Sequence, residues 1–402
     1  MMFQKLITLT ERLEDPKNPL LGPTLKGLYL FGLWQTGGKI QTICYNVFHC
    51  STVVFVVSQF TDLYLVRNDI TKVLNNISLT ALSVVCVVKC FSYVLRQAKW
   101  KELVKEISQE ELLQIKKQDE VTMKLMAKYT EYTRVITYMY WMMVFFTNAL
   151  LLTTPLIKYL SSKKYREEIK GGSEPPHIMN SWLPLNTSEM PGYLIEIVVH
   201  VIMGCQGAAV VAVYDMNAIS IMSYLKGQLL ILKAKCKGIF DDGSRVDVLN
   251  RIKECHRHHT VLLKHYRLFN SLLSPTMFVY VLICSITICC SVIQFSSKEA
   301  TPSQRIWVIQ YTTSQVAQLF LYCWHSNEIT TESRKLDRGI YDSDWWKGDT
   351  VLRRQILLLS GKLSQLFILE AGPYTTLSVP TFIDIMKGSY SFYTLFVQMQ
   401  DD

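Results

Sequence analysis

The chain has 402 residues, of which 49% are hydrophobic and 19% charged, with a formal net charge of +9. This composition is too apolar for a disordered or fibrous protein. Basic and acidic residues alternate, without a Gly/Arg tract or compact basic stripe, so we expect no nucleic-acid partner. The charges cluster between apolar runs that approach the roughly 20 residues needed to span a bilayer as a helix. The sequence therefore indicates an all-α membrane protein.

Seven apolar windows are candidate transmembrane helices. They are residues 41–61, 71–94, 133–157, 193–217, 272–295, 306–325 and 378–399. The N-terminal residues carry acids where a signal peptide has an apolar core, so we expect insertion through an internal span. An eighth apolar window, 351–370, contains Arg353, Arg354 and Lys362. Because each charge costs about 2.5–3.5 kcal/mol at the bilayer centre, this window is predicted to be an amphipathic helix outside the membrane.

The distribution of Lys and Arg orients these spans. Of 42 such residues, 30 lie in four segments on one side: 1–40, 95–132, 226–271 and 326–377. The positive-inside rule makes this side cytoplasmic, so the N-terminus is predicted inside and the C-terminus outside. Asn186 begins an Asn-Thr-Ser glycosylation sequon in the longest predicted outer loop, which fits this orientation.

The predicted cytoplasmic segments have the pattern of amphipathic helices rather than loops. In residues 99–130, Trp100, Leu103, Val104 and Ile107 recur at helical spacing with charges between them. Residues 221–270 behave similarly, with one break at 241–244. We expect a cytosolic helical region that continues the spans.

The sequence has no recognisable motif for catalysis or for binding a cofactor or a metal. The chain has no GxxxxGK[ST], GxGxxG after a strand or GxSxG motif, so we expect no enzyme and no cofactor. His256, His258, His259 and His265 form a cluster without zinc-motif spacing, which predicts a solvated helix face and no metal. Carboxylates near the middle of the spans are scarce, which argues against a proton-coupled transporter.

The last window has a helical stripe that includes Ser391, Leu395 and Met399, with Gln398 beside it. If several copies surround an axis, Leu395 and Met399 would form apolar rings that block ions by dewetting, and Gln398 would give a polar lining. From periodicity alone, ordinary packing of this stripe against neighbouring helices is the favoured interpretation. The candidate pore-gate residues are Leu395, Gln398 and Met399.

Four windows carry polar and aromatic residues in their predicted outer halves. If these residues converge, they make a small, mostly apolar cavity suited to a volatile organic molecule; the alternative is plain interhelical core. The candidate ligand-binding residues are Leu79, Thr80, Ser83, Val84, Met142, Phe145, Phe146, Ala149, Val199, His200, Met203, Ile306, Ile309, Gln310 and Thr313.

The C-terminal quarter contains LFLYCWHSN at 319–327, Ser333, Tyr341 and Trp345, and GSYSFYTL at 388–395. In order and spacing, these blocks closely resemble those of insect odorant receptors. The N-terminal GLYLFGLW at 27–34 is similar to the start of that family, and the inverted seven-span layout matches it. Two positions depart from the family pattern, Ser326 for Gly and Gln35 for Pro.

The resemblance implies an odorant-gated, non-selective cation channel. It implies a tuning subunit that assembles as a heterotetramer with the odorant receptor co-receptor. The complex would lie in the plasma membrane of olfactory sensory neurons, in contact with membrane lipids. A small volatile organic ligand would bind among spans two to six, and the last span would line the pore. The expected domains are a cytosolic or interfacial segment (1–40), six spans with the pocket (41–325), a cytosolic anchor region (326–377) and the pore-lining helix (378–402).

Two other functions remain open from the sequence. A gustatory-type ligand-gated channel has the same topology, but its last span usually has a Thr-Tyr ending where this chain has Ser-Tyr-Ser. A seven-helix G-protein-coupled receptor places its N-terminus outside, and the chain lacks the DRY and NPxxY motifs of that class.

Overall fold

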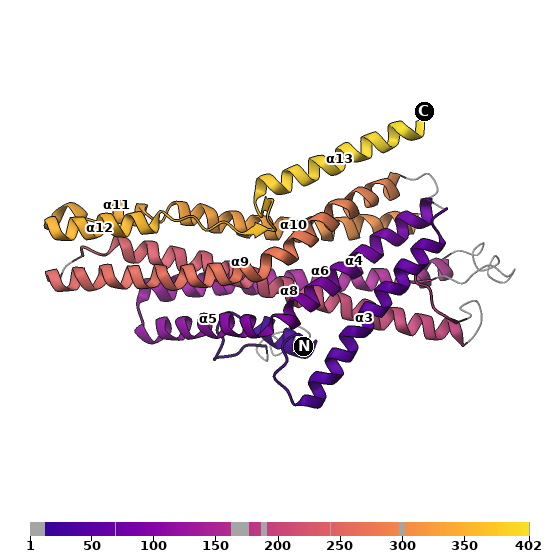
Figure 1. Cartoon of the computed structure of the whole chain (residues 1–402), viewed down its shortest axis with the longest axis horizontal. Helices are drawn as coiled ribbons and strands as arrows, with labels where there is room; N and C mark the ends of the chain where they lie inside the picture. Colours follow the sequence, from indigo (N-terminus) through magenta and orange to yellow (C-terminus); the bar gives the residue numbers. More distant parts are fainter. Residues whose placement is uncertain are drawn as a thin grey trace.

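The computed structural model describes residues 13–68, 70–161, 177–185, 191–241, 243–296 and 302–401. These residues form an elongated helical bundle (Figure 1). Its helices are α2 (Gly22–Leu30), α3 (Lys39–Leu65), α4 (Ile70–Leu95), α5 (Gln97–Lys117), α6 (Glu120–Ser161), α8 (Gly192–Lys237), α9 (Arg245–Ser296), α10 (Pro302–Arg334), α11 (Arg338–Tyr341), η1 (Trp345–Lys347), α12 (Thr350–Leu363) and α13 (Val379–Asp401). The strands β1 (Glu370–Ala371) and β2 (Thr375–Thr376) pair antiparallel.

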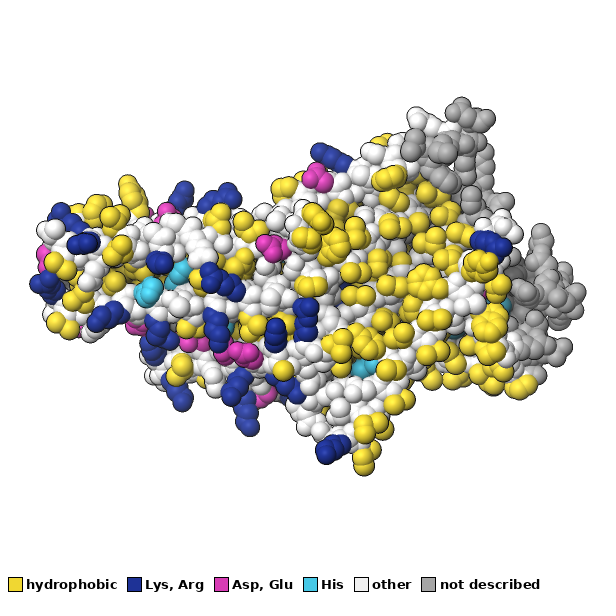
Figure 2. All heavy atoms as spheres, in the orientation of Figure 1, with side chains coloured by type: hydrophobic (Ala, Val, Ile, Leu, Met, Phe, Trp, Pro, Cys, Tyr) yellow, Lys and Arg dark blue, Asp and Glu magenta, His cyan; other side chains and the backbone are white. Residues whose placement is uncertain are grey.

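The bundle has an apolar half and a charged half. Charged side chains gather around α5, α11, α12 and the adjoining parts of α8 and α9, whereas hydrophobic side chains cover the other half (Figures 1 and 2). The helix α9 has 52 residues, which corresponds to a length of about 78 Å. A bilayer core is only about 30 Å thick, so α9 extends well beyond the membrane. The predicted continuation of spans into a charged helical region is confirmed.

All seven predicted apolar windows coincide with helices of the structure. Five helical segments of the described chain are long and apolar enough to cross a membrane: Lys39–Leu65, Asn76–Leu95, Glu120–Thr153, Gly192–Lys237 and Arg245–Ser296. The remaining two windows lie in α10 and α13, which carry more polar residues. In the apolar half, α6 packs on α8, α4 packs on α9, and α10 packs on both α8 and α9. The helices α3 and α13 lie on opposite sides of this bundle (Figure 1).

In the charged half, the predicted amphipathic stripe is confirmed. Trp100, Leu103, Val104 and Ile107 are buried, where α5 packs against α9. The segment 99–130 forms two helices rather than one, because Gln118 adopts a left-handed conformation with φ 51° and ends α5. The second helix, α6, continues without interruption into the apolar half.

The prediction of a helix over 351–370 is correct only in its first two thirds. Asp349 caps α12 by accepting the Leu352 N–H at 2.8 Å, and the helix ends at Leu363. The following residues are extended because other helices satisfy their backbone groups: Ser333 and Tyr266 accept the N–H groups of Phe367 and Ile368. A turn at Gly372, which has φ +72°, then leads through β2 into α13.

Candidate functional site

The apolar half contains a cavity of about 110 Å³ between α4, α6, α8 and α10. Its wall is mostly carbon. The lining residues are Leu82, Ser83, Cys86, Tyr140, Met143, Val144, Thr147, Asn148, Leu151, Met179, Gly204, Gly207, Ala208, Val211, Trp307, Tyr311, Ser314, Gln315 and Gln318. In another protein, an apolar cavity of about 150 Å³ stays dry and binds benzene. The space therefore suits a small organic molecule.

Hydroxyl groups in the cavity wall mostly donate to backbone carbonyl groups. Ser83 donates to Leu79 at 3.1 Å, Ser314 to Gln310 at 2.9 Å, and Tyr311 to Ser78 at 3.0 Å. Such internal bonds keep polar groups from opposing an apolar occupant.

Two polar atoms of lining residues have no hydrogen-bond partner among the described residues. They are the carbonyl oxygen Oε1 of Gln315 and the indole nitrogen Nε1 of Trp307. Both are buried, and an unsatisfied buried polar group costs about 1–3 kcal/mol. An occupant able to hydrogen-bond would therefore gain affinity at these positions.

A buried ion pair lies directly behind the cavity wall. The Lys89 ammonium lies 2.5 Å from Oδ1 of Asp215, and both side chains are inaccessible to solvent. The Asp215 carboxylate also accepts Tyr140 at 2.7 Å, Gln318 at 2.5 Å and Tyr322 at 2.7 Å. Tyr140 and Gln318 line the cavity, so the wall of the cavity is bonded directly to this carboxylate.

The ion pair ties together helices that are distant in sequence. Lys89 belongs to α4, Asp215 to α8 and Tyr140 to α6, while Gln318 and Tyr322 both belong to α10. From α9, the ring of Tyr280 lies 4.9 Å from the Lys89 ammonium, a distance at which a cation is attracted to an aromatic face. Ionisable groups within membrane bundles are expensive and mark functional sites by default.

Residues 177–185 contribute one side chain to the cavity wall. Met179 lines the cavity, and its neighbours attach this segment to the bundle. His177 Nδ1 lies 2.8 Å from Glu196, and the Ser181 hydroxyl lies 2.8 Å from His200 Nε2. The Trp182 N–H donates to the Ser58 carbonyl of α3 at 3.1 Å. The described segment is thus attached to two helices, α3 and α8.

Comparison with known proteins identifies the family. A sequence profile described as 7tm Odorant receptor matches residues 69–390. The chain belongs to the odorant receptor family. One similar relative is Odorant receptor Or2 of Anopheles gambiae, which is 22% identical over 36% of this chain and 38% of the relative. Another is Odorant receptor 46a, isoform B, of Drosophila melanogaster, which is 25% identical over 45% of this chain and 49% of the relative. The chain thus spans less than half the length of these two relatives, although it matches 78% of Odorant receptor 22c of Drosophila melanogaster at 23% identity.

Solved structures share the fold of this receptor. The insect olfactory receptor OR5 from Machilis hrabei in complex with eugenol superposes with a TM-score of 0.81, covering 96% of this chain and 100% of that one at 12% identity. The structure of OR5 described without a named ligand gives a TM-score of 0.77 over 94% and 97%, at 13% identity. The receptor is therefore a multi-pass membrane protein with the seven-helix fold of its family.

The structure does not bring the fifteen predicted ligand-binding residues together on the cavity. Ser83 lines it. Buried elsewhere are Thr80 and His200, and partly buried are Leu79, Val84, Ala149, Val199, Met203 and Gln310. The remaining residues are exposed on the surface of the chain: Met142, Phe145, Phe146, Ile306, Ile309 and Thr313.

The helices that line the cavity were predicted correctly, but their rotation was not. On α6, Met143 and Thr147 line the cavity, whereas Met142 and Phe146 face outward. A shift of one residue rotates a helix position by about 100°. Because lipid is as apolar as the interior of a bundle, hydrophobic residues occur on both sides of the helix, and hydrophobicity does not identify the inner side.

The remaining predicted positions lie partly outside the described residues. Asn186, the predicted glycosylation site, lies outside them. The three predicted gate residues belong to α13 by their backbone. Of their side chains, only that of Gln398 is described, and it is exposed. Their roles in glycosylation and gating stay predictions. In the described part of the chain, no group of three or more His, Cys, Asp or Glu side chains is arranged to hold a metal ion.

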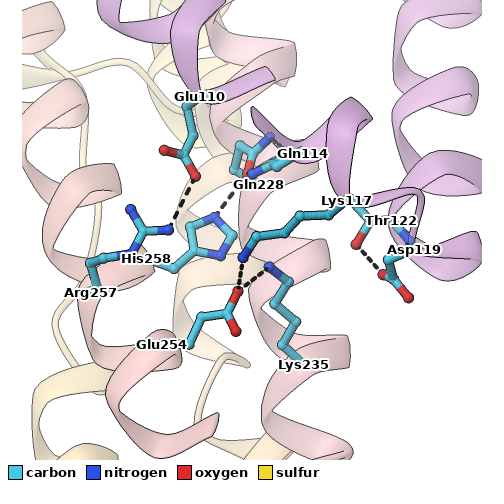
Figure 3. A network of polar contacts seen from close by, with 10 residues as sticks. All are labelled: Glu110, Gln114, Lys117, Asp119, Thr122, Gln228, Lys235, Glu254, Arg257 and His258. Carbon is cyan, nitrogen blue, oxygen red and sulfur yellow. Dashed lines mark hydrogen bonds and ion pairs between the residues drawn. The ribbon is translucent and has the colours of Figure 1, made fainter. Parts of the chain in front are cut away.

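The prediction that the histidine cluster forms a solvated face is wrong for three of its four members. His258, His259 and His265 are buried, and His256 is exposed. His258 Nε2 lies 2.8 Å from the Gln228 oxygen, and Gln228 forms reciprocal amide hydrogen bonds with Gln114 of α5 (Figure 3). Ion pairs surround this contact: Glu254 with Lys117 and Lys235, and Glu110 with Arg257.

Burial, followed by the nearby charges of Lys235 and Arg257, lowers the pKa of His258 from 6.5 to about 3. The folded receptor therefore keeps this imidazole neutral, with Nε2–H donating to Gln228. Because the folded-state pKa lies below the unfolded value, the stabilisation is present above pH 6.5 and is lost as the pH falls toward 3. At pH 5 the loss from His258 is about 2 kcal/mol.

We expect the thermal stability of the purified receptor to fall between pH 7 and pH 5, and to fall less in the variant His258→Gln. Glutamine donates to Gln228 without titrating. The measurement is the melting temperature in detergent at both pH values. His256→Gln serves as the matched control, because this imidazole is exposed on the surface of the chain, and the variant should behave as the wild type. Equal losses in His258→Gln and the wild type would contradict the assignment.

Proposed function

We propose that the receptor is the tuning subunit of an odorant-gated, non-selective cation channel. It would assemble as a heterotetramer with the odorant receptor co-receptor in the plasma membrane of olfactory sensory neurons. The observation that supports this most is the largely apolar cavity between α4, α6, α8 and α10. A volatile organic molecule partitions into such a space by burying its apolar surface, at roughly 25 cal/mol per Å².

In the proposed gating, ligand binding in the cavity acts on the pore helix α13 through α10. This helix contributes Gln315 and Gln318 to the cavity wall. Its Phe320 ring also packs edge-on against the Phe382 ring of α13, with the two ring centroids 5.5 Å apart. On the other side, α13 packs against α9. A ligand that fits the cavity better when α10 is displaced would favour the arrangement with an open pore, because gating shifts only by differential affinity.

The proposed pore is formed by α13 and its counterparts in the other subunits. Within the single chain, Tyr390 and Phe392 of α13 are about two-thirds exposed, which leaves this helix available for contacts between subunits. Leu395 and Met399 would form the apolar constriction and Gln398 the polar lining. The N-terminus would be cytosolic, with residues 326–377 in the cytosolic anchor region and Asn186 glycosylated outside.

Cells that express the receptor together with the co-receptor should give an inward cation current when a volatile panel is applied. The co-receptor expressed alone should not give the same ligand selectivity, because the cavity belongs to the tuning subunit. Whole-cell recording with and without this chain is the measurement. Silence across the panel at verified surface expression would contradict the proposal.

Replacing Leu395 by serine should raise the current without ligand and alter ion permeation. A hydroxyl in place of an apolar ring lowers the barrier caused by dewetting. Single-channel recording of the variant measures both effects, with Tyr393→Phe as the control, because Tyr393 lies about 200° around α13 from Leu395. Unchanged conductance and unchanged gating would remove Leu395 from the pore.

A further inference from the structure

We infer that the cavity selects molecules with a hydrogen-bond donor, a small alcohol in particular, whose hydroxyl donates to Oε1 of Gln315. The inference rests on the proposed function and names the chemical class of its ligand. Gln315 belongs to α10, lines the cavity and is 8% exposed. Its carbonyl oxygen has no partner among the described residues.

The orientation of the Gln315 amide follows from its neighbours. Tyr311 has a single hydroxyl proton, which it donates to the Ser78 carbonyl at 3.0 Å. The Tyr311 oxygen can therefore only accept from Gln315, and Nε2 of Gln315 lies 2.7 Å from it. The amide nitrogen is thus held at Tyr311, and the acceptor Oε1 is the end of the amide that remains unbonded.

Most other polar side chains of the cavity wall are already hydrogen-bonded, and the Asn148 amide nitrogen lies 3.8 Å from the Cys205 sulfur. Tyr140 and Gln318 donate to Asp215, and the Thr147 and Ser314 hydroxyls lie 2.7 Å apart. These donors are therefore occupied, whereas the Gln315 acceptor is not. A ligand that only accepts hydrogen bonds, such as an ether, leaves Oε1 unsatisfied, and a hydrocarbon does the same.

The unbonded donor Nε1 of Trp307 is not an alternative partner for the same hydroxyl. Its indole N–H is a donor only, so a ligand hydroxyl cannot give its proton to Trp307. Selection for a donor depends on Gln315.

The test compares three probes with seven heavy atoms each: 1-hexanol, methyl pentyl ether and heptane. Currents are recorded from cells that express the receptor with the co-receptor. Because satisfying one buried acceptor is commonly worth a factor of about ten, 1-hexanol should act at a concentration about tenfold lower than the ether or heptane. In Gln315→Met, which keeps the length but removes the acceptor, the three potencies should converge.

The matched control is Gln310→Met on the same helix. The Gln310 amide donates to Thr147 at 3.2 Å, and Gln310 does not contribute to the cavity lining, so this variant should keep the preference for the alcohol. Equal potency of alcohol and ether in the wild type, or an alcohol preference that survives in Gln315→Met, would overturn the inference. So would no response to 1-hexanol in a receptor that answers other volatiles, an outcome that leaves the proposed function intact. Silence toward every volatile would instead reject the proposed function and the inference with it.

Discussion

Replacing Asp215 by asparagine is expected to destabilise the receptor by roughly 3–5 kcal/mol, because the change leaves the buried Lys89 ammonium without a counter-ion. Asparagine keeps one acceptor oxygen, but Tyr140 and Tyr322 donate to different oxygens of Asp215, so the loss includes one hydrogen bond as well as the charge. The variant Lys89→Met should cost less, since the Asp215 carboxylate then retains three donors, from Tyr140, Gln318 and Tyr322. Thermal unfolding of purified protein and surface expression measure both effects.

The double variant Lys89→Met/Asp215→Asn should recover most of the stability lost in Asp215→Asn. It removes both charges and keeps the hydrogen-bond acceptor, and neutral replacements of buried ion pairs are often tolerated. The control is Asp344→Asn, which breaks an exposed ion pair with Lys347 and should cost under about 1 kcal/mol. A double variant no more stable than Asp215→Asn would show that the charges are not the reason for the loss.

Filling the cavity from α8 is expected to abolish sensitivity to volatile ligands while leaving the fold intact. Gly207 lines the cavity, and the nearest atom that a Cβ at this position would meet is the Cys86 sulfur, at 3.8 Å. The variant Gly207→Leu therefore extends into the space that a ligand requires. We expect the concentration for half-maximal current to rise at least tenfold, which corresponds to about 1.4 kcal/mol of binding free energy.

Two variants control for effects other than volume in the cavity. Gly207→Ala adds a single methyl group at ordinary contact distance and should respond nearly as the wild type. Ile202→Phe adds bulk on the exposed side of the same helix and should leave the concentration dependence unchanged. If Gly207→Leu keeps wild-type sensitivity at normal surface expression, the ligand binds elsewhere.

The membrane-spanning helices were predictable because a span must be continuously apolar over about 20 residues. Their continuation beyond the bilayer was predictable from the amphipathic stripe that begins at Trp100. The rotation of each helix in the apolar half was not predictable. Phe145 and Met143 are both hydrophobic, yet Phe145 is 69% exposed and Met143 lines the cavity.

The buried ion pair was missed although the sequence contained a signal for it. Lys89 is one of two lysines in the apolar window 71–94, and Asp215 is one of two acids in the window 193–217. Opposite charges in separate apolar windows are natural partners. Only the tertiary structure brings them to 2.5 Å.

The buried histidines also had a signal in the sequence. Ile252, Cys255, Leu262 and Phe269 form an apolar stripe on α9 and are buried. His259 lies four residues after Cys255 and three before Leu262, so it continues the stripe at helical spacing. The adjacent charges at 251–257 are instead typical of a solvated face. The packing of α9 against α5, α8 and α12 buries these histidines.

The account depends on a volatile ligand occupying the cavity between α4, α6, α8 and α10 in an assembled channel whose pore is lined by α13. The most direct test is a cryo-electron microscopy structure of the receptor with the co-receptor and an activating volatile. We expect ligand density in contact with Cys86, Gly207 and Gln315, and α13 bordering the central axis. An empty cavity with ligand density elsewhere, or an α13 that faces lipid, would contradict it.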